Sequence, residues 1–269
     1  MTGPVAILGA GKMGETLLSG LLRAGMRASD LMVTTRGAQR GALLRERYAV
    51  EAVGNAQAAK DAETLVLTVK PQDMDGLLAE IAPAVGADRL VVSIAAGIPT
   101  AFIEGRLVDG VPVVRVMTNT PALVDEAMSA ISPGSHADES HLRRAEELFR
   151  PVGHVLRVPE SQQDAVTALS GSGPAYFYYL VEALTDAGIL LGLPRAVAHD
   201  LVVQTAIGAA VMLRDSGDHP VTLREAVTSP AGTTISAIRE LENHRVRAAI
   251  LTAIEAARDR ARELASGHG

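Results

Sequence analysis

A polar loop in the carboxyl-terminal half places hydroxyl groups where an anion is readily bound. The segment is Val227-Thr228-Ser229-Pro230-Ala231-Gly232-Thr233-Thr234-Ile235. Pro230 and Gly232 forbid a continuous helix through it, and the helical pattern resumes at Ile235, so the loop runs into a helix N-terminus. The free N–H groups there bind anions, and Ser229, Thr233 and Thr234 add hydroxyls. Helix capping by Thr233 or Thr234 is the simpler alternative, although three hydroxyls exceed what a cap requires.

A second chemical signal stands at the start of the chain, where an apolar run breaks into a glycine pattern. Val5–Leu8 is followed by Gly9-Ala10-Gly11-Lys12-Met13-Gly14 and then by a helical pattern. In a dinucleotide-binding turn, the first glycine allows the tight turn, the second lets the backbone approach a pyrophosphate, and the third lets the helix pack against the strand. Residues Leu8 to Met13 are therefore candidate cofactor-binding residues, with the helix N-terminus aimed at the phosphates.

The loop after the second predicted strand indicates which dinucleotide is bound. NAD-specific folds place an acid there for the ribose 2′-hydroxyl, whereas an arginine suits a 2′-phosphate. Here Leu31–Thr34 is followed by Thr35-Arg36, with Arg40 one turn further on and no acid. The sequence therefore predicts NADP(H) in preference to NAD(H), the alternative being that Arg36 is an ordinary solvated charge.

These residues require a parallel sheet to position them. Short β-branched runs, among them Thr64–Val69, Leu90–Ser93 and Val113–Met117, alternate with helical patterns, which is typical of a doubly wound sheet covered on both faces. Ligands bind beyond the carboxyl ends of such strands. The residues at those ends join the candidate cofactor-binding set: Asn55, Thr68, Val69, Lys70, Pro71, Ala95, Ala96 and Asn119. Each has a plainer explanation, such as a surface charge for Lys70 or an Asx turn for Asn119.

Beyond Pro159 the strand pattern stops and helices follow, including 164–193, 195–216 and 245–264. We therefore predict two domains, an α/β Rossmann-type domain over residues 1–159 and an all-α domain over 160–269. Four of the seven aromatic residues are consecutive at 176–179, so the helix that carries them must be covered nearly all round. Core packing within the domain and burial between subunits both explain this, and we predict a homo-oligomer formed through the helical half.

Composition excludes several function classes. A net charge of −6 without a basic stripe makes nucleic acid a poor partner, and the absence of cysteine removes disulfides, thiol nucleophiles and cysteine metal sites. The seven histidines show no clustered spacing, so no metal is predicted. The most apolar helical stretches, 187–193 and 206–213, are shorter than the roughly 20 residues of a membrane span. No secretory signal is visible, and a cytoplasmic location is expected by default.

At this point the chain resembles the pyrroline-5-carboxylate reductase family over essentially its whole length. The most specific segments are Ser170-Gly171-Ser172-Gly173-Pro174-Ala175-Tyr176 and Thr228–Thr234. In the amino-terminal half the turn Gly9–Gly11, Val69-Lys70-Pro71 and Met117-Thr118-Asn119-Thr120-Pro121 are similar to family motifs, with Thr118 where many members have proline.

The resemblance implies hydride transfer from NAD(P)H to the C=N bond of a five-membered cyclic imine bearing a carboxylate, which gives L-proline. It implies that Ser229, Ala231, Gly232, Thr233 and Thr234 bind the substrate, with backbone N–H groups on the carboxylate and the Thr234 hydroxyl, as catalytic group, on the ring nitrogen. It also implies a homodimer of interlocked helices, with a ring of dimers as a larger assembly.

Three alternatives remain beside this prediction. A related cyclic imine is one alternative substrate, since pocket size is not readable from sequence. A β-hydroxyacid dehydrogenase-like enzyme would need a lysine as general acid in the helical half, and the lysines are Lys12, Lys60 and Lys70. A non-catalytic NADP-binding regulator would bind cofactor without imine reduction.

Overall fold

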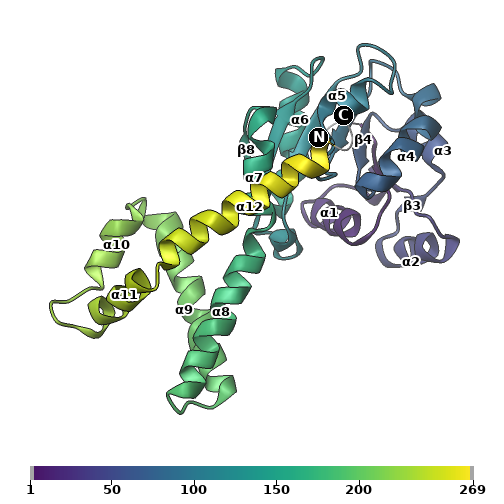
Figure 1. Ribbon diagram of the computed structural model, residues 1–269. Coiled ribbons are helices and arrows are strands. Elements are labelled where there is room, and N and C mark those ends of the chain that lie inside the picture. Colours follow the sequence, from purple (N-terminus) through teal and green to yellow (C-terminus); the bar gives the residue numbers. More distant parts are fainter. Residues whose placement is uncertain (1–2, 267–269) are drawn as a thin grey trace. The chain divides into compact units, whose positions relative to one another are not determined.

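The computed structural model describes residues 3–266, which divide into two compact units (Figure 1). The sheet unit comprises the chain up to Ser172 together with the residues from Ala257 onward, and the helical unit comprises Gly173–Ala256.

The sheet unit contains one eight-stranded sheet in the order β3-β2-β1-β4-β5-β6-β7-β8. Its strands are β1 (Val5–Leu8), β2 (Leu31–Val33), β3 (Glu51–Ala52), β4 (Thr64–Leu67), β5 (Leu90–Ser93), β6 (Val113–Met117), β7 (Ala127–Pro133) and β8 (Gly153–Arg157). All neighbours pair in parallel except β6 and β7, which are antiparallel. Chain order runs outward in both directions from β1, which confirms the predicted doubly wound fold.

Helices cover both faces of this sheet (Figure 1). They are α1 (Lys12–Arg23), α2 (Ala38–Tyr48), α3 (Asn55–Asp61), α4 (Met74–Ile81), α5 (Thr100–Glu104), α6 (Glu139–Phe149) and α7 (Gln163–Val166). One core joins alternate strand residues to α1, α2 and α6, and the other core joins the intervening residues to α3, α4 and α5. In β1, for example, Ile7 belongs to the first core and Leu8 to the second, as strand alternation requires.

The helical unit consists of α8 (Gly173–Leu190), α9 (Arg195–Ser216), α10 (Pro220–Ala226), α11 (Thr233–Asn243) and the first half of α12 (Val246–Ser266). The all-α carboxyl-terminal half is thus confirmed. The single helix predicted over 164–193 is wrong in detail, because a π-helical turn at Thr167–Gly171 separates α7 from α8. Gly171 lies close to β6 there, since an added Cβ would lie 2.3 Å from the terminal methyl group of Met117.

The compact units divide 13 residues later than the predicted boundary at 159/160, because residues 160–172 pack on the sheet. The fully buried Gln163 donates to the Ala130 carbonyl (3.1 Å) and to Ser132 Oγ (2.8 Å). Glu160 accepts from the Thr100 N–H and hydroxyl at 2.8 and 2.6 Å. The last turns of α12 also join the sheet unit, which no local sequence pattern indicated.

Helix α9 corrects the statement that the apolar stretches are short. It has 22 residues with a mean hydropathy of 1.6 over its most apolar window, and within residues 3–266 it is the one helix long and apolar enough to span a membrane. Such a helix alone is weak evidence for a membrane protein. In this unit α9 packs on α8, where Ala198 is buried against Gly188 at a spacing that leaves no room for a Cβ.

Candidate active site

The glycine turn after β1 is held by the end of β2. Gly9 has a φ of 86°, which favours glycine, and an added Cβ would lie 2.5 Å from Val69 Cγ1. The Gly9 N–H donates to Thr34 Oγ1 at 3.0 Å, and the Ala10 N–H donates to the Thr34 carbonyl at 2.8 Å. Thr34 therefore fixes the turn from the neighbouring strand. This role of Thr34 was not predicted, because a hydroxyl residue at the strand end is its only local signal in the sequence.

The end of β4 holds the same turn from the other side. The Thr68 hydroxyl lies 3.0 Å from the Leu8 carbonyl and 2.9 Å from the Gly9 carbonyl, and it donates to this pair. A Cβ on Gly14 would lie 2.8 Å from Thr68 Oγ1 and 3.1 Å from Ile7 Cγ2. Gly14 thus lets α1 approach the sheet closely, as the motif predicts, and the predicted cofactor residue Thr68 acts here by positioning the turn.

Gly11 differs from the other two glycines because its missing side chain faces space. An added Cβ would meet only the Gly9 carbonyl oxygen, at 3.8 Å. Gly11 is also the N-cap of α1, and no side chain caps this helix. Backbone N–H groups at an uncapped helix start, reached past a residue without a side chain, fit the diphosphate of a dinucleotide.

Two arginines follow β2, and both are paired with acids. Arg36 forms an ion pair with Asp73, which precedes α4. Arg40 forms an ion pair with Glu15 of α1 at 2.5 Å and approaches the Ala10 carbonyl at 3.4 Å. The Thr35 hydroxyl turns back to the Gly37 carbonyl at 3.0 Å. The predicted loop therefore holds its cations beside the glycine turn, together with acids that the sequence did not place there.

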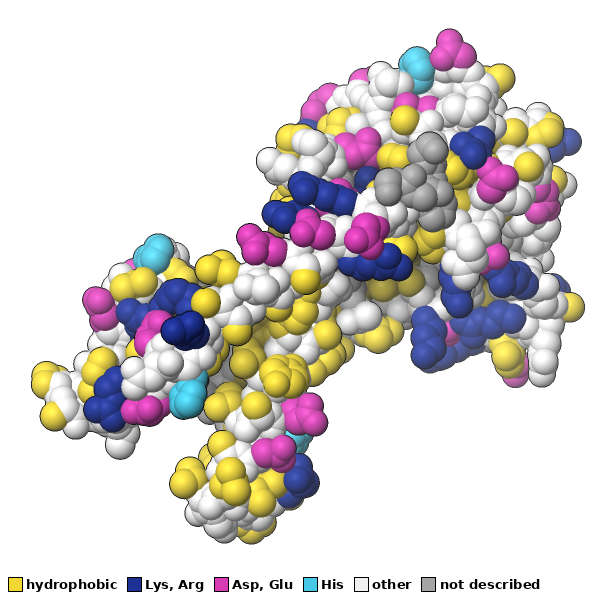
Figure 2. Space-filling view, in the orientation of Figure 1, with side chains coloured by type: hydrophobic (Ala, Val, Ile, Leu, Met, Phe, Trp, Pro, Cys, Tyr) yellow, Lys and Arg dark blue, Asp and Glu magenta, His cyan; other side chains and the backbone are white. Residues whose placement is uncertain are grey.

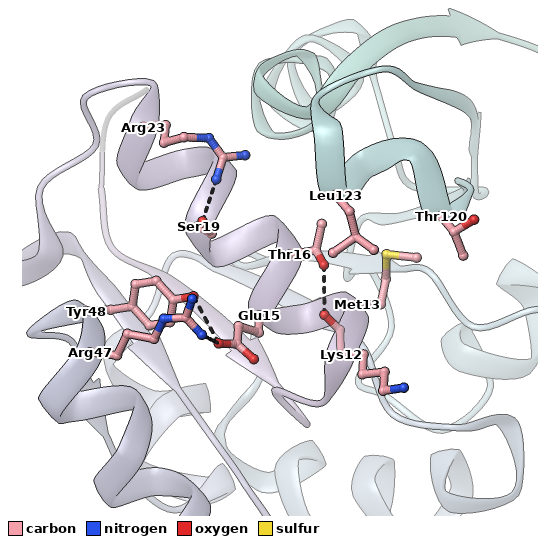
Figure 3. A pocket seen from close by; sticks show the side chains of 10 residues that line it. All are labelled: Lys12, Met13, Glu15, Thr16, Ser19, Arg23, Arg47, Tyr48, Thr120 and Leu123. Atoms are coloured by element: carbon pink, nitrogen blue, oxygen red, sulfur yellow. Dashed lines mark hydrogen bonds and ion pairs between the residues drawn. The ribbon is translucent and has the colours of Figure 1, made fainter. Parts of the chain in front are cut away.

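Glu15 is the centre of a small polar cluster between α1 and α2. Arg47 and Tyr48 converge on its carboxylate at 3.1 and 2.9 Å, beside a pocket of about 470 Å³ (Figure 3). Burial disfavours the ionised carboxylate, but hydrogen bonds from Arg40 and Tyr48 and the charges of Arg40 and Arg47 outweigh it and lower the pKa of Glu15. Burial and the bond to Glu15 raise the pKa of Tyr48.

Lys12 and Met13 line this pocket beside the glycine turn. A short 3-10 turn, Pro71–Asp73, follows β4. Lys70 immediately precedes this turn and is exposed. Asn55 begins α3 after β3, and its amide donates to Glu80 of α4 at 2.8 Å.

The remaining predicted cofactor residues lie beyond β5 and β6. Ala95 is buried and Ala96 is exposed after β5. The Asn119 amide donates to the Ser170 carbonyl at 3.1 Å, and its Oδ1 accepts from the Met128 N–H at 3.1 Å. The sheet brings these residues to the edge that carries the glycine turn, and it gives Asn119 two protein partners instead of an Asx turn.

In the helical unit, the hydroxyl loop leads into α11 with its first turn uncapped. Helix α11 begins at Thr233, Gly232 is its N-cap, and no side chain makes a capping hydrogen bond. Ala231 has a φ of 55°, and a Cβ on Gly232 would lie 2.3 Å from Ser229 Oγ. The loop is thus tightly folded, and Thr233 and Thr234 lie in the first helical turn with their N–H groups available for an anion.

Comparison with known proteins shows which family has this arrangement of domains. Residues 160–264 match the family model for pyrroline-5-carboxylate reductase dimerisation, and residues 4–97 match the model for NADP oxidoreductase, coenzyme F420-dependent. The chain is 46% identical over 264 residues to the pyrroline-5-carboxylate reductase of Corynebacterium melassecola, covering 97% of this chain and 98% of the relative. The chain belongs to the pyrroline-5-carboxylate reductase family.

Solved structures of this family agree with the fold. The pyrroline-5-carboxylate reductase of Coxiella burnetii matches with a TM-score of 0.93 and 35% identity, covering 98% of this chain and 99% of that one. The pyrroline carboxylate reductase of Plasmodium falciparum, solved with NADP bound, matches with a TM-score of 0.87 and 26% identity, covering 98% of each chain. Family membership favours the imine reductase over the β-hydroxyacid dehydrogenase-like alternative. Within residues 3–266 no group of three or more His, Cys, Asp or Glu side chains is placed to hold a metal.

Proposed function

We propose that this protein reduces the C=N bond of 1-pyrroline-5-carboxylate to give L-proline, with NADPH preferred to NADH. The uncapped start of α11 carries the substrate half of this proposal. A carboxylate at the N–H groups of Ala231, Thr233 and Thr234 would occupy a helix N-terminus that has no side-chain cap, while the Gly232 N–H donates to the Ser229 carbonyl at 3.1 Å and holds the turn. Because Ala231 and Gly232 are fixed by the tight turn, these groups are organised before the substrate arrives.

The sheet unit carries the cofactor half. The open side of Gly11 and the uncapped start of α1 fit the diphosphate, and Arg36 and Arg40 follow β2, where a Rossmann-type fold would place an adenosine 2′-phosphate. The bound nicotinamide supplies the hydride. The protein's own task is to hold the two reactants, exclude water and handle one proton. A protonated imine already has an electrophilic carbon, so a strong general acid is not required.

Thr234 is proposed as the group that contacts the imine nitrogen. It stands in the first turn of α11, so its hydroxyl and the carboxylate-binding N–H groups belong to one rigid element. We expect Thr234→Ala to lower kcat/KM by roughly 10²-fold, in the range of a positioned proton-handling group. Thr234→Ser should retain most activity, and Thr222→Ala, an exposed threonine of α10, should change little.

The decisive assay is NADPH consumption with pyrroline-5-carboxylate, run beside the six-membered cyclic analogue. A kcat/KM higher for the five-membered imine supports the proposal. Binding of NADPH without turnover of either imine would contradict it and favour a non-catalytic regulator. The ratio of kcat/KM for NADPH and NADH tests the cofactor preference in the same experiment.

The helical unit is proposed to form a homodimer. Hydrophobic side chains gather over its helices (Figure 2), and Phe177, Leu190 and Leu191 are 69%, 89% and 84% exposed in the single chain. Large apolar surface of this kind marks an interaction site, and the dimerisation model spans these residues. This favours burial between subunits over core packing for the aromatic residues of α8. A light-scattering mass equal to one chain at micromolar concentration would contradict the dimer. The ring of dimers and the cytoplasmic location stay predictions.

A further inference from the structure

Asp73 joins two segments that are distant in the sequence. It ends the short 3-10 turn Pro71–Asp73, which runs directly into α4, and its own backbone angles are helical (φ −99°, ψ −6°). Its carboxylate makes no capping hydrogen bond to the first turn of α4. The carboxylate is instead paired with Arg36, 37 positions earlier in the chain.

The pair joins the loops that follow the two strands on either side of β1. Arg36 follows β2 and Asp73 follows β4, and β1 lies between these two strands in the sheet. A dinucleotide binds across the end of β1, with its adenosine ribose beside the loop after β2. The side chain of Arg36 is 75% exposed and that of Asp73 30%, so the carboxylate is the more fixed partner and the guanidinium is free to move.

Resting on the cofactor assignment above, we propose that Asp73 is a specificity-determining residue that competes with the adenosine 2′-phosphate for Arg36. When the phosphate binds, the guanidinium must leave the carboxylate or be shared with it. The carboxylate also repels the phosphate dianion. Both effects act on a 2′-phosphorylated cofactor and spare one with a free 2′-hydroxyl, so Asp73 limits the preference for NADPH.

The test measures nucleotide affinity without any turnover. Calorimetric titration of the full-length protein with 2′,5′-ADP and with 5′-ADP isolates the contribution of the 2′-phosphate. We expect Asp73→Asn to tighten 2′,5′-ADP by roughly 3- to 10-fold, given the modest strength of exposed ion pairs plus the removed repulsion. Its effect on 5′-ADP should stay within about 2-fold, and the gain should shrink at high salt.

The chain offers a control two residues further on. Asp75, in the first turn of α4, pairs with Arg106 at 2.5 Å and is 73% exposed against 30% for Asp73, so Asp75→Asn removes an ion pair that does not involve the loop after β2. It should leave both affinities unchanged. Asp73→Ser is the second test variant, because it removes the charge with a smaller polar side chain. In an Arg36→Ala background, Asp73→Asn should lose most of its effect.

The outcomes separate this inference from the function on which it rests. Unchanged 2′,5′-ADP affinity in both Asp73 variants would overturn the inference alone. Weakened 5′-ADP binding would also overturn it, since Asp73 would then be a ligand of the ribose hydroxyl. Failure of the unaltered protein to bind either nucleotide would overturn the cofactor assignment, and this inference with it.

Discussion

The glycines of the turn after β1 allow cofactor binding and folding to be perturbed separately. A Cβ on Gly11 would face space, whereas a Cβ on Gly14 would lie 2.8 Å from Thr68 Oγ1 and 3.1 Å from Ile7 Cγ2. The Thr68 hydroxyl cannot move freely, because it bonds to the Leu8 and Gly9 carbonyls. We therefore expect Gly14→Ala to act on stability and Gly11→Ala to act on cofactor affinity.

The magnitudes follow from these distances. In Gly14→Ala, overpacking costs about 1–3 kcal/mol and the displaced Thr68 hydrogen bond about 1 kcal/mol, while alanine in place of glycine within a helix returns about 1 kcal/mol. The net loss in free energy of unfolding is about 1–3 kcal/mol. Gly11→Ala meets no close atom, and its gain of up to about 1 kcal/mol from a less flexible unfolded chain is offset because glycine is preferred to alanine at an N-cap, so this free energy should change by less than about 1 kcal/mol. Its methyl group blocks the approach of a phosphate, and losing one charged hydrogen bond weakens binding by about 10-fold or more.

Two measurements check the separation. Urea unfolding at one fixed protein concentration gives the stability of each variant, which matters because self-association adds to apparent stability. NADPH fluorescence titration gives the dissociation constant. Equal destabilisation by the two substitutions, or NADPH affinity in Gly11→Ala equal to that of the unaltered protein, would refute the assignment of Gly11 to cofactor approach.

Two further predictions concern charged groups of the sheet unit. Arg115 of β6 is 6% exposed and donates a hydrogen bond to Glu160 at 3.2 Å. Arg115→Met should lower the free energy of unfolding by about 2 kcal/mol, which is less than for a fully buried pair because Glu160 is partly solvated. A urea midpoint no lower than that of the control variant Arg106→Met would contradict this. Because the pKa of Glu15 is lowered from 4.5 when folded, its stabilisation is complete above pH 4.5 and is lost as the pH falls through the folded value. The melting temperature should therefore fall less between pH 6 and pH 3 in Glu15→Gln than in the unaltered protein. Parallel curves of melting temperature against pH for the two proteins would contradict a stabilising role of the Glu15 carboxylate.

Much of the sheet unit was predictable because its signals are local. The buried β-branched runs predicted β5 and β6 with their observed bounds, and the glycine spacing predicted the turn, since each depends on neighbouring residues. Helices α3 and α5 were missed. They have seven and five residues and bury two residues each, which is too short for a helical period to emerge from the sequence.

The contacts that shape the candidate site were less accessible, because they join distant segments. Glu15 meets Tyr48 across 33 positions, and Asn119 meets Ser170 across 51. Neither pairing follows from a repeat or a spacing. Each depends on which strands become neighbours and on where a helix ends, and those are properties of the folded sheet. The family resemblance supplied the reaction and the substrate residues, which the glycine turn alone left open.

The two arginines after β2 show why cofactor preference depends on more than one loop. The absence of an acid after β2 predicted NADPH, but folding brings Glu15 to Arg40 and Asp73 to Arg36. Each of these arginines therefore has a carboxylate partner before any cofactor binds, and Arg40 shares Glu15 with Arg47. A 2′-phosphate carries nearly two negative charges and several acceptor oxygens, so it can outcompete a single carboxylate for a mobile guanidinium. Because Arg36 is the more exposed cation and Arg40 also contacts the glycine turn, Arg36 is the arginine that can exchange its carboxylate for the phosphate while the turn stays in place.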